Sequence, residues 1–475
     1  MATRLKAPNI VLIMSDQQRW DTLACNGYDH MITPHVDALA QRGVSLTHAF
    51  VQGAVCGPSR NSIVSSQYVH THGMEGNEQW LRPDQPNWIE SLRAGGYRTA
   101  NIGKMHTSPI RLPAGFEHRT VVENKNYQQG LHGPDPDDYD LHLAHYGLKR
   151  PALTYYQDIE DWPDRLQATV WPHDDALYPD NYIGQRTVDY IDDCDFERPL
   201  FMWCGFAGPH DPFDVTEPFL RLYDDAQIPD PVARDGELES KPPPQQAQMD
   251  GMEGKRAPAT VWWSRATPER IRTMRKHYYA NVTLIDDWVG KIVAAVEARG
   301  QLDNTLFVFT SDHGDCLGDH HQVYKFSSHY DSVARVPLVF AGPGVGALGT
   351  SDPLVELIDL GPTLLQMAGL GPLEGASGQS LAGCLGGPTD DKPDHGAAEL
   401  HDAVFSEHAG RVMVRTHDWK LVAYPGESFG ELYDLRQDPD ELYNLYDSPE
   451  AQTARGGLYE RLAQWYGATR MRTPR

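Results

Sequence analysis

Asn-Ile-Val-Leu-Ile-Met-Ser-Asp, residues 9–16, is the stretch of sequence that decides the fold. Its apolar run from Ile10 to Met14 is typical of a central strand in a parallel sheet, because such a strand is buried on both faces. The run leads into a carboxylate, Asp16, and ligand sites in open α/β sheets lie at the carboxyl ends of the strands. The sequence therefore predicts a buried strand that ends in a functional side chain.

Strand-like runs and helical segments alternate over the first three quarters of the chain. A cap residue followed by proline, Thr33-Pro34, predicts the start of a helix that ends at Gly43. A long helical stretch runs from Thr267 to Gly300. Further apolar strands are expected at residues 44–50, 97–102, 199–206, 305–310 and 336–341. This alternation predicts an α/β fold with one large mixed, mostly parallel sheet flanked by helices.

Two segments interrupt the alternation and suggest the domain organisation. Residues 211–267 contain Lys241-Pro-Pro-Pro and little periodicity, so we predict an insertion there, either a lid or an oligomer contact. From residue 387 the chain is polar and then strand-like, and it closes with a helix over 451–465. We expect a catalytic domain over residues 1–386 and a small C-terminal α+β subdomain with an antiparallel sheet over 387–475.

The charge balance argues against nucleic acid as a partner. The 475 residues include 41 Lys and Arg against 66 Asp and Glu, a formal net charge of −25. An anionic substrate would need positive side chains or a metal ion gathered locally against this field. The five-residue apolar run near the N-terminus does not fit a signal peptide, and no apolar run has the length of a membrane span. We therefore expect a cytoplasmic protein with no membrane partner.

One of the six cysteines stands in a distinctive motif, Cys56-Gly-Pro-Ser-Arg60. An isolated cysteine is more often a small buried residue. Here, however, the motif and several others in the same order mean that the chain resembles the type I sulfatases of the alkaline phosphatase superfamily, which oxidise the cysteine of Cys-x-Pro-Ser-Arg to formylglycine. The other matching segments are Asp16-Gln17, Gly103-Lys-Met-His106, Pro209-His210-Asp-Pro212, Thr310-Ser-Asp-His-Gly314, Gly318-Asp-His320, Tyr324-Lys325 and Arg335-Val-Pro337.

This resemblance implies a sulfuric ester hydrolase of the arylsulfatase type. It would cleave a small-molecule sulfate ester through a covalent sulfo-enzyme intermediate, with formylglycine made from Cys56 as the nucleophile. A formylglycine-generating or equivalent maturation enzyme is then a partner, and the resemblance also implies a homo-oligomer, either a dimer or a tetramer. The implied catalytic residues are Cys56, Arg60, Lys104, His106, His210 and Lys325.

The resemblance also assigns a role to each of these side chains. Arg60 would hold the modified residue, and His106 would accept the proton whose loss releases sulfate. Lys104 and Lys325 would neutralise substrate oxygens, although a single lysine is more often solvated. His210 would bind or protonate the leaving oxygen. The substrate-binding residues are Asn77, Lys104, His210 and Lys325.

Two pairs of polar residues at strand ends suit a metal ion. Asp16-Gln17 and Asp312-His313 offer three oxygens and one nitrogen, a set that fits a hard or borderline divalent cation. The family resemblance makes these four residues and Cys56 the ligands of one divalent ion, calcium or manganese, and the histidine favours manganese. An isolated Asp-His pair could instead cap a helix.

Two other functions are compatible with the sequence. Phosphonate monoester and phosphodiester hydrolases share the nucleophile and the metal set, but they tend to carry tyrosine and threonine where this chain has Lys104 and His106. A non-catalytic metal-binding scaffold would retain Cys56 as a thiol. Other histidines close to the motifs are expected at the surface or around the site: His70, His72, His320, His321 and His329.

Overall fold

The computed structural model describes residues 7–125, 136–151, 155–156, 158–159, 161–252, 263–325, 328–386 and 400–470. Within these ranges the chain forms a nine-stranded sheet, ordered β4-β3-β5-β1-β6-β8-β2-β7 with β9 paired to β2, and a four-stranded sheet, β10-β11-β12-β13. The strands of the large sheet are β1 (Asn9–Asp16), β2 (Val44–Phe50), β3 (Arg98–Gly103), β4 (His118–Val121), β5 (Leu200–Pro209), β6 (Thr305–Ser311), β7 (Arg335–Val336), β8 (Leu338–Ala341) and β9 (Gly349–Glu356). The small sheet contains β10 (Val404–His408), β11 (Arg411–Arg415), β12 (Trp419–Ala423) and β13 (Gly430–Asp434).

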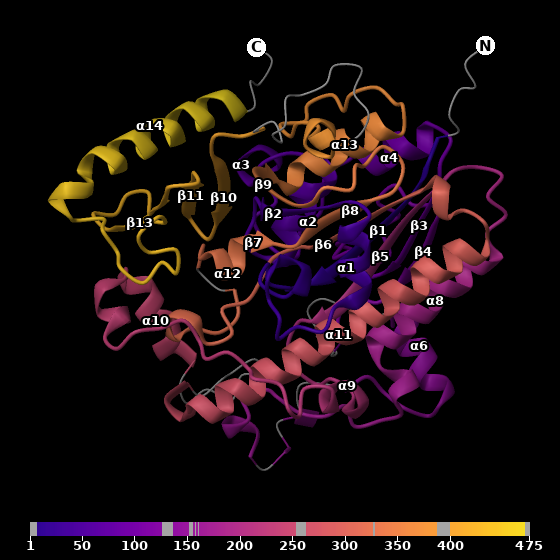
Figure 1. The fold of residues 1–475 in the computed structure, drawn as a ribbon, viewed down its shortest axis with the longest axis horizontal. Coiled ribbons are helices and arrows are strands. Elements are labelled where there is room, and N and C mark those ends of the chain that lie inside the picture. Colours follow the sequence, from indigo (N-terminus) through magenta and orange to yellow (C-terminus); the bar gives the residue numbers. More distant parts are fainter. Residues whose placement is uncertain are drawn as a thin grey trace.

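Helices cover both faces of the large sheet (Figure 1). The helices are α1 (Pro34–Gln41), α2 (Cys56–Ser65), α3 (Val69–His72), α4 (Trp88–Ala94), α6 (Asp138–His145), α8 (Pro179–Asp193), α9 (Glu217–Arg221), α10 (Pro243–Met252), α11 (Pro268–Ala298), α12 (Asp331–Ala334), α13 (Leu360–Met367) and α14 (Gln452–Thr469). One apolar core packs β1 against α1, α6, α8 and α11, and the core on the opposite face packs it against α2, α4 and α13. This arrangement confirms the predicted α/β class.

Strand β1 lies at the centre because its side chains serve both cores. Every residue from Asn9 to Asp16 is buried. Val11 and Ile13 belong to one core and Ile10, Leu12 and Met14 to the other, as the two-residue period of a strand requires. A sheet covered on both faces favours such a continuous apolar run over an alternating one.

The parallel strands bring distant residues to one edge of the sheet. β1 pairs in parallel with β5 and with β6, and β3 pairs in parallel with β5. Their carboxyl ends therefore lie side by side, and a polar residue of a sequence motif either ends each strand or follows it directly. These residues are Asp16, Lys104, His210 and Asp312. The prediction that strand ends would assemble the site depends on this topology.

The C-terminal sheet packs beside the large one, under α14 (Figure 1). Its four strands are consecutive and antiparallel. Bridges from Gly53 to Glu407 and from Leu354 to His401 join the two parts. The antiparallel sheet is as expected, whereas the predicted boundary at residue 387 lies outside the described residues and stays a prediction.

One local expectation needs correction. The expected strand 336–341 is two strands, β7 and β8, because Pro337 has no backbone N–H to give to the ladder. Both strands pair antiparallel, which accounts for the mixed character of the sheet. The segment 211–267 contains α9 and α10, its part 253–262 lies outside the described residues, and its role as an insertion stays a prediction.

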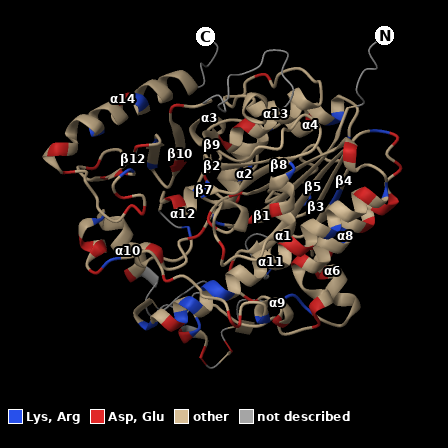
Figure 2. Cartoon of the chain, viewed as in Figure 1, with Lys and Arg blue, Asp and Glu red and all other residues tan. Residues whose placement is uncertain are grey.

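Acidic and basic side chains are distributed along the whole chain. Figure 2 shows Asp and Glu on helices and loops throughout the molecule rather than in one segment.

Among the helices of the described residues, none has both the length and the apolar character needed to cross a bilayer.

Candidate active site

Arg60 joins the two carboxylates that end neighbouring strands. Its Nε donates to Oδ2 of Asp312 at 2.8 Å, and one terminal nitrogen donates to Oδ2 of Asp16 at 3.2 Å. All three side chains are fully buried. Burial opposes the ionisation of Asp16, but the positive charges of Lys104, His210 and Arg60 outweigh it and hold the pKa of Asp16 well below its ordinary value. The Oδ2 atoms are thus committed to Arg60.

The remaining atoms of this group converge on one point. Sγ of Cys56 lies 3.0 Å from Nε2 of His313 and 3.8 Å from Oδ1 of Asp16. Nε2 of His313 lies 3.8 Å from Oδ1 of Asp312. All four donor atoms lie within 4.8 Å of one another, and all four residues are buried. The structure thus brings together four of the five residues that the resemblance names as metal ligands: Asp16, Cys56, Asp312 and His313.

This donor set suits a divalent cation. Nδ1 of His313 lies 2.9 Å from the carbonyl oxygen of Gly314, so it carries the proton and leaves the lone pair of Nε2 facing the centre. Burial also lowers the pKa of His313, which keeps the ring neutral. Two carboxylate oxygens and an imidazole nitrogen therefore offer ligand atoms to a hard or borderline ion, beside the Cys56 side chain.

Gln17 takes part in a polar chain beside this centre. Its Oε1 accepts from Nζ of Lys325 at 2.5 Å, and its Nε2 donates to Oδ2 of Asp315 at 2.5 Å. Nζ of Lys325 also lies 2.8 Å from Nε2 of His210, which joins two predicted substrate-binding residues. Asp315 in turn accepts the backbone N–H groups of residues 317 and 324, which fixes the loop that carries Lys325.

Lys104 is a buried cation with two defined partners. Its Nζ lies 2.6 Å from Oδ2 of Asp16 and donates to Oδ1 of Asn124 at 2.8 Å. Burial disfavours its charge, yet the charge of Asp16 prevails and raises the pKa of Lys104. Lys104 therefore stays protonated and adds a fixed positive charge beside the metal-ligand group.

His106 is held as a neutral ring. Its backbone has a positive φ of 64°, and its N–H donates to Oε2 of Glu123 at 3.0 Å. Burial, followed by the charges of Lys104 and Arg60, lowers the pKa of His106 well below its ordinary value. Both ring nitrogens are buried and have no hydrogen-bond partner within the described residues. A neutral ring with a free lone pair can accept a proton.

Asn77 supports the start of α2. Its Oδ1 accepts the N–H of Gly57 at 2.9 Å, so the side chain that was expected to contact substrate also satisfies one of the free N–H groups at the helix N-terminus. Cys56 is the first residue of that helix. The positive end of the helix dipole thus faces the nucleophile position.

Three of the five histidines expected at the surface or around the site are buried. His72, His320 and His329 are buried, whereas His70 and His321 are partly exposed. His72 lies under α2, with Nε2 2.8 Å from Oγ of Ser62, and His320 stacks on Tyr330 with ring centroids 3.6 Å apart. His320 also contacts Glu237, with 2.7 Å between Nδ1 and Oε1, and this contact between distant segments could not be read from the motifs.

Several residues that position the site were not singled out from the sequence. Asp315 follows the Asp312-His313 motif closely, and that closeness is a usable signal. Asn124 and Glu123 come from the segment after β4, where the sequence carries no motif. Ser59 donates to the backbone oxygen of Asp312 at 2.6 Å, so the serine of the Cys56 motif has a structural role.

Comparison with known proteins agrees with this geometry. A family model described as Sulfatase matches residues 8–370, and one described as N-sulphoglucosamine sulphohydrolase, C-terminal, matches residues 318–467. The chain is 29% identical to an arylsulfatase of Clostridium perfringens, over 93% of this chain and 91% of that protein. It is 28% identical to a choline-sulfatase of Rhizobium meliloti, over 93% of this chain and 83% of that protein.

Solved structures are similar too. A phosphonate monoester hydrolase of Agrobacterium radiobacter superposes with a TM-score of 0.81 at 25% identity, over 97% of this chain and 96% of that one. Since the Sulfatase model spans well over half of the sequence, the chain belongs to the sulfatase family of sulfuric ester hydrolases, within the alkaline phosphatase superfamily.

Proposed function

We propose that this protein hydrolyses sulfate esters of the arylsulfatase type, with a formylglycine made from Cys56 as the nucleophile and one divalent metal ion, calcium or manganese. The observation that carries the proposal is the convergence of Asp16, Cys56, Asp312 and His313 at the N-terminus of α2. The fully buried carboxylates leave their Oδ1 atoms free of Arg60, as ligands of a cation would be.

The metal ion and the modified residue would each supply one kind of chemistry. A bound divalent ion screens the negative oxygens of the sulfuryl group and favours a deprotonated hydroxyl as nucleophile. The hydrated aldehyde of formylglycine offers two hydroxyls on one carbon, one to attack and one whose deprotonation releases sulfate. A plain thiol at residue 56 provides neither of these hydroxyls.

The side chains of the protein itself account for the other requirements. Arg60 fixes Asp16 and Asp312 relative to α2. Lys104 and Lys325 bring positive charge to the substrate oxygens. Lys325 also holds His210, which is set to contact the leaving oxygen. Gln17 is the fifth proposed ligand, although its Oε1 also accepts from Lys325.

His106 is the proposed base. Its neutral ring has both nitrogens free within the described residues, so it can accept a proton near neutral pH without first losing one. Asn77 is proposed to contact substrate from the position where it caps Gly57.

Peptide mass tests the nucleophile directly. Trypsin should release residues 43–60, which contain Cys56 and end at Arg60. Conversion to the aldehyde lowers the mass of this peptide by about 18 Da, because hydrogen sulfide is lost and oxygen gained. Finding only the thiol in protein from its native host would contradict a formylglycine nucleophile. The same preparation shows whether a maturation enzyme has acted.

A second candidate is hydrolysis of phosphonate monoesters or phosphodiesters. It is favoured by the similarity to the phosphonate monoester hydrolase structure. The ratio of kcat/KM on aryl sulfate to that on aryl phosphonate distinguishes the two activities. We expect sulfate to be preferred, and a large preference for phosphonate would assign the second function instead. The dimer or tetramer and the cytoplasmic location stay predictions from the sequence.

A further inference from the structure

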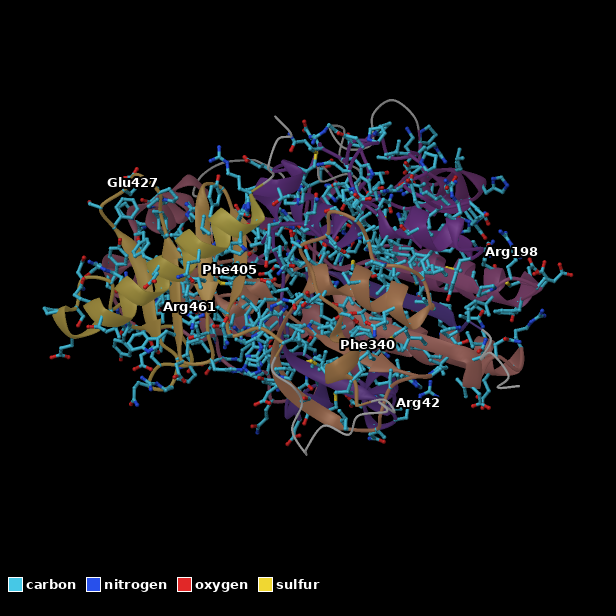
Figure 3. The ribbon with its side chains drawn as sticks, turned by 90° about the horizontal axis from the view of Figure 1, so that it is seen from above. Arg42, Arg198, Phe340, Phe405, Glu427 and Arg461 are labelled. Carbon is cyan, nitrogen blue, oxygen red and sulfur yellow. The ribbon has the colours of Figure 1, made fainter. Side chains whose placement is uncertain are left out.

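A cavity of about 910 Å³ lies between the C-terminal sheet and α14. This volume is within the range of small-molecule pockets. Its walls come from the turn between β10 and β11, the segment after β12, and α14, with contributions from α2 and α3. In Figure 3 the labelled Glu427, which lines the cavity, lies at the α14 end of the molecule, far from Arg198 at the other end.

Aromatic rings form much of the wall. They belong to Tyr424, Tyr459, Trp465 and Tyr466. Tyr459 and Tyr466 are 37% and 48% exposed, so both side chains line the cavity while part of each is open to solvent. Flat rings of this kind bind a ligand ring by stacking and by apolar contact.

Arg411 is a buried cation in this wall that forms no ion pair among the residues that the structure describes. It is only 7% exposed, and its Nε and Nη1 atoms have no hydrogen-bond partner within the described residues. Its guanidinium lies 5.1 Å from the ring centroid of Tyr424. A buried guanidinium without an anion is unfavourable, so an anionic ligand group would complete this site.

The acidic residues that line the cavity do not pair with Arg411. Glu75 and Glu427 are exposed at the rim. Glu407 instead contacts His70, with 2.7 Å between Oε1 and Nδ1. His408 adds a polar ring to the wall beside Arg411. A cationic ligand would be repelled by Arg411 at the inner wall. The carboxylates of Glu75 and Glu427 at the rim are therefore not enough to favour a cationic ligand.

The cavity adjoins the catalytic centre through α2 and β10. Pro58, two residues after Cys56, lines it. The backbone N–H of Glu407 donates to the backbone oxygen of Gln52 at 2.9 Å, and Glu407 forms a β-bridge with Gly53. These contacts join β10 to the loop that leads into α2. Burial lowers the pKa of His408 to about 4, and Arg411, His313 and Lys325 contribute to this shift in that order. His408 therefore lies within electrostatic reach of the catalytic residues.

We propose that this cavity binds the organic part of the sulfate ester and that Arg411 pairs with a further anionic group on it, a carboxylate or a second sulfo group. The inference rests on the proposed function for the identity of the ester, while the anion site itself is independent of turnover. The substrate class is thus a ring-containing sulfate ester with a second negative charge.

A matched series of esters tests this proposal. The compounds are naphthyl sulfate and its carboxy, sulfo and trimethylammonio derivatives. A buried, charge-assisted pair with Arg411 should raise kcat/KM for the carboxy or sulfo ester on the order of 10- to 100-fold over naphthyl sulfate. The ratio between these two acidic esters tells a carboxylate site from a sulfo site. No preference for either, or the highest kcat/KM on the trimethylammonio ester, would overturn the proposal.

Variants of Arg411 test whether the preference for acidic esters arises in the cavity. Arg411→Gln should bring the ratio of acidic to unsubstituted ester close to one, and Arg411→Lys should retain part of it. The matched control is Arg461→Gln on α14, since Arg461 pairs with Asp402 and does not line the cavity. An unchanged ratio in a folded Arg411→Gln protein contradicts the role of Arg411. If Arg411→Gln fails to fold, the ratio of acidic to unsubstituted ester measured for Arg411→Lys and for the unmutated protein still tests the role of Arg411.

Binding without turnover separates this inference from the proposed function. Calorimetric titration of naphthalene carboxylate into the protein should show binding that weakens about tenfold or more in Arg411→Gln. If the protein cleaves no sulfate ester but shows this difference, the proposed function fails and the anion site stands. Equal binding by both proteins would overturn the anion site whatever the activity.

Discussion

Sγ of Cys56 lies 3.0 Å from Nε2 of His313, the nitrogen that faces the centre because Nδ1 is bonded to the carbonyl oxygen of Gly314. The first residue belongs to the N-terminus of α2 and the second follows the end of β6. The position proposed for the nucleophile and a proposed metal ligand therefore share one centre. Exchange of sulfur for oxygen at residue 56 would change a soft ligand into a hard one that suits calcium or manganese better.

Metal binding should be detectable as thermal stabilisation. Removal of divalent ions with a chelator should abolish hydrolysis and lower the melting temperature by a few degrees, because saturation at about 100 times the dissociation constant is worth about 2.7 kcal/mol. Asp312→Asn should remove the metal-dependent shift, which differential scanning calorimetry with and without calcium or manganese would measure. Asp303→Asn, an exposed residue before β6, is the control. A full shift in Asp312→Asn would contradict its assignment as a ligand.

The contact between Lys325 and His210 should matter for the reaction rather than for the metal. Lys325→Met should lower kcat/KM on aryl sulfate by roughly 100-fold or more, since a positioned positive group is lost at the substrate oxygens. The metal-dependent melting shift should persist, although Gln17 loses its lysine donor. Steady-state kinetics and calorimetry measure the two effects, with Lys149→Met, an exposed residue, as control. Equal activity in the two variants would remove Lys325 from the substrate site.

The main sheet and much of the candidate site could be predicted because one physical rule covers them. Apolar runs fully buried between two helix layers are visible in the sequence, and parallel strands necessarily end at the same edge. Asp16 and Asp312 could be related in this way although β1 and β6 are far apart in the chain. Pro337 also indicates a break between two strands, but the long apolar run around it suggested a single strand.

Other parts of the site depend on packing between distant segments. Glu123 and Asn124 reach His106 and Lys104 only because β4 pairs with β3, and no local pattern marks them. The cavity around Arg411 likewise requires the C-terminal sheet to dock beside α2 and α3. A charged residue in a strand gives no indication in the sequence that it will be buried without a partner.

Burial of His72 should make the fold sensitive to acid. The N–H of Met74 donates to its Nδ1, Nε2 lies 2.8 Å from Oγ of Ser62, and burial, followed by the charges of His70 and Arg82, lowers the pKa of His72 to about 3. In the unfolded state the His72 ring binds a proton with a pKa near 6.5, whereas in the folded state it stays neutral down to about pH 3. The free energy of unfolding therefore falls as pH decreases from about 6.5 towards 3. At pH 5 this costs about 2 kcal/mol.

Replacement of the ring isolates this contribution. His72→Gln cannot titrate, so its loss of stability between pH 7.5 and pH 5 should be smaller than that of the unmutated protein by about 2 kcal/mol. Denaturant unfolding at the two pH values measures the difference, and His145→Gln on the exposed face of α6 serves as control. A parallel decline in His72→Gln and the unmutated protein would show that His72 is not responsible.

Glu123 should have the opposite pH dependence. Burial raises the pKa of Glu123 to about 7, although Arg119 and Lys104 oppose the shift. Between pH 4.5 and 7 the folded state keeps a proton that the unfolded state has released, so this contribution to stability is full below about pH 4.5 and is lost as pH rises through 7. Its total is roughly 3 kcal/mol.

Glu123→Gln keeps an oxygen for the N–H of His106 and removes the titration. Relative to the unmutated protein it should gain roughly 2–3 kcal/mol in the free energy of unfolding when pH rises from 5 to 8. Glu90→Gln, on the exposed face of α4, should show no such gain. Glu123→Ala removes the acceptor as well, so its kcat on aryl sulfate should fall further than that of Glu123→Gln, because the positive φ of His106 is then less well held. Equal kcat in the two variants would mean that Glu123 does not position the proposed base.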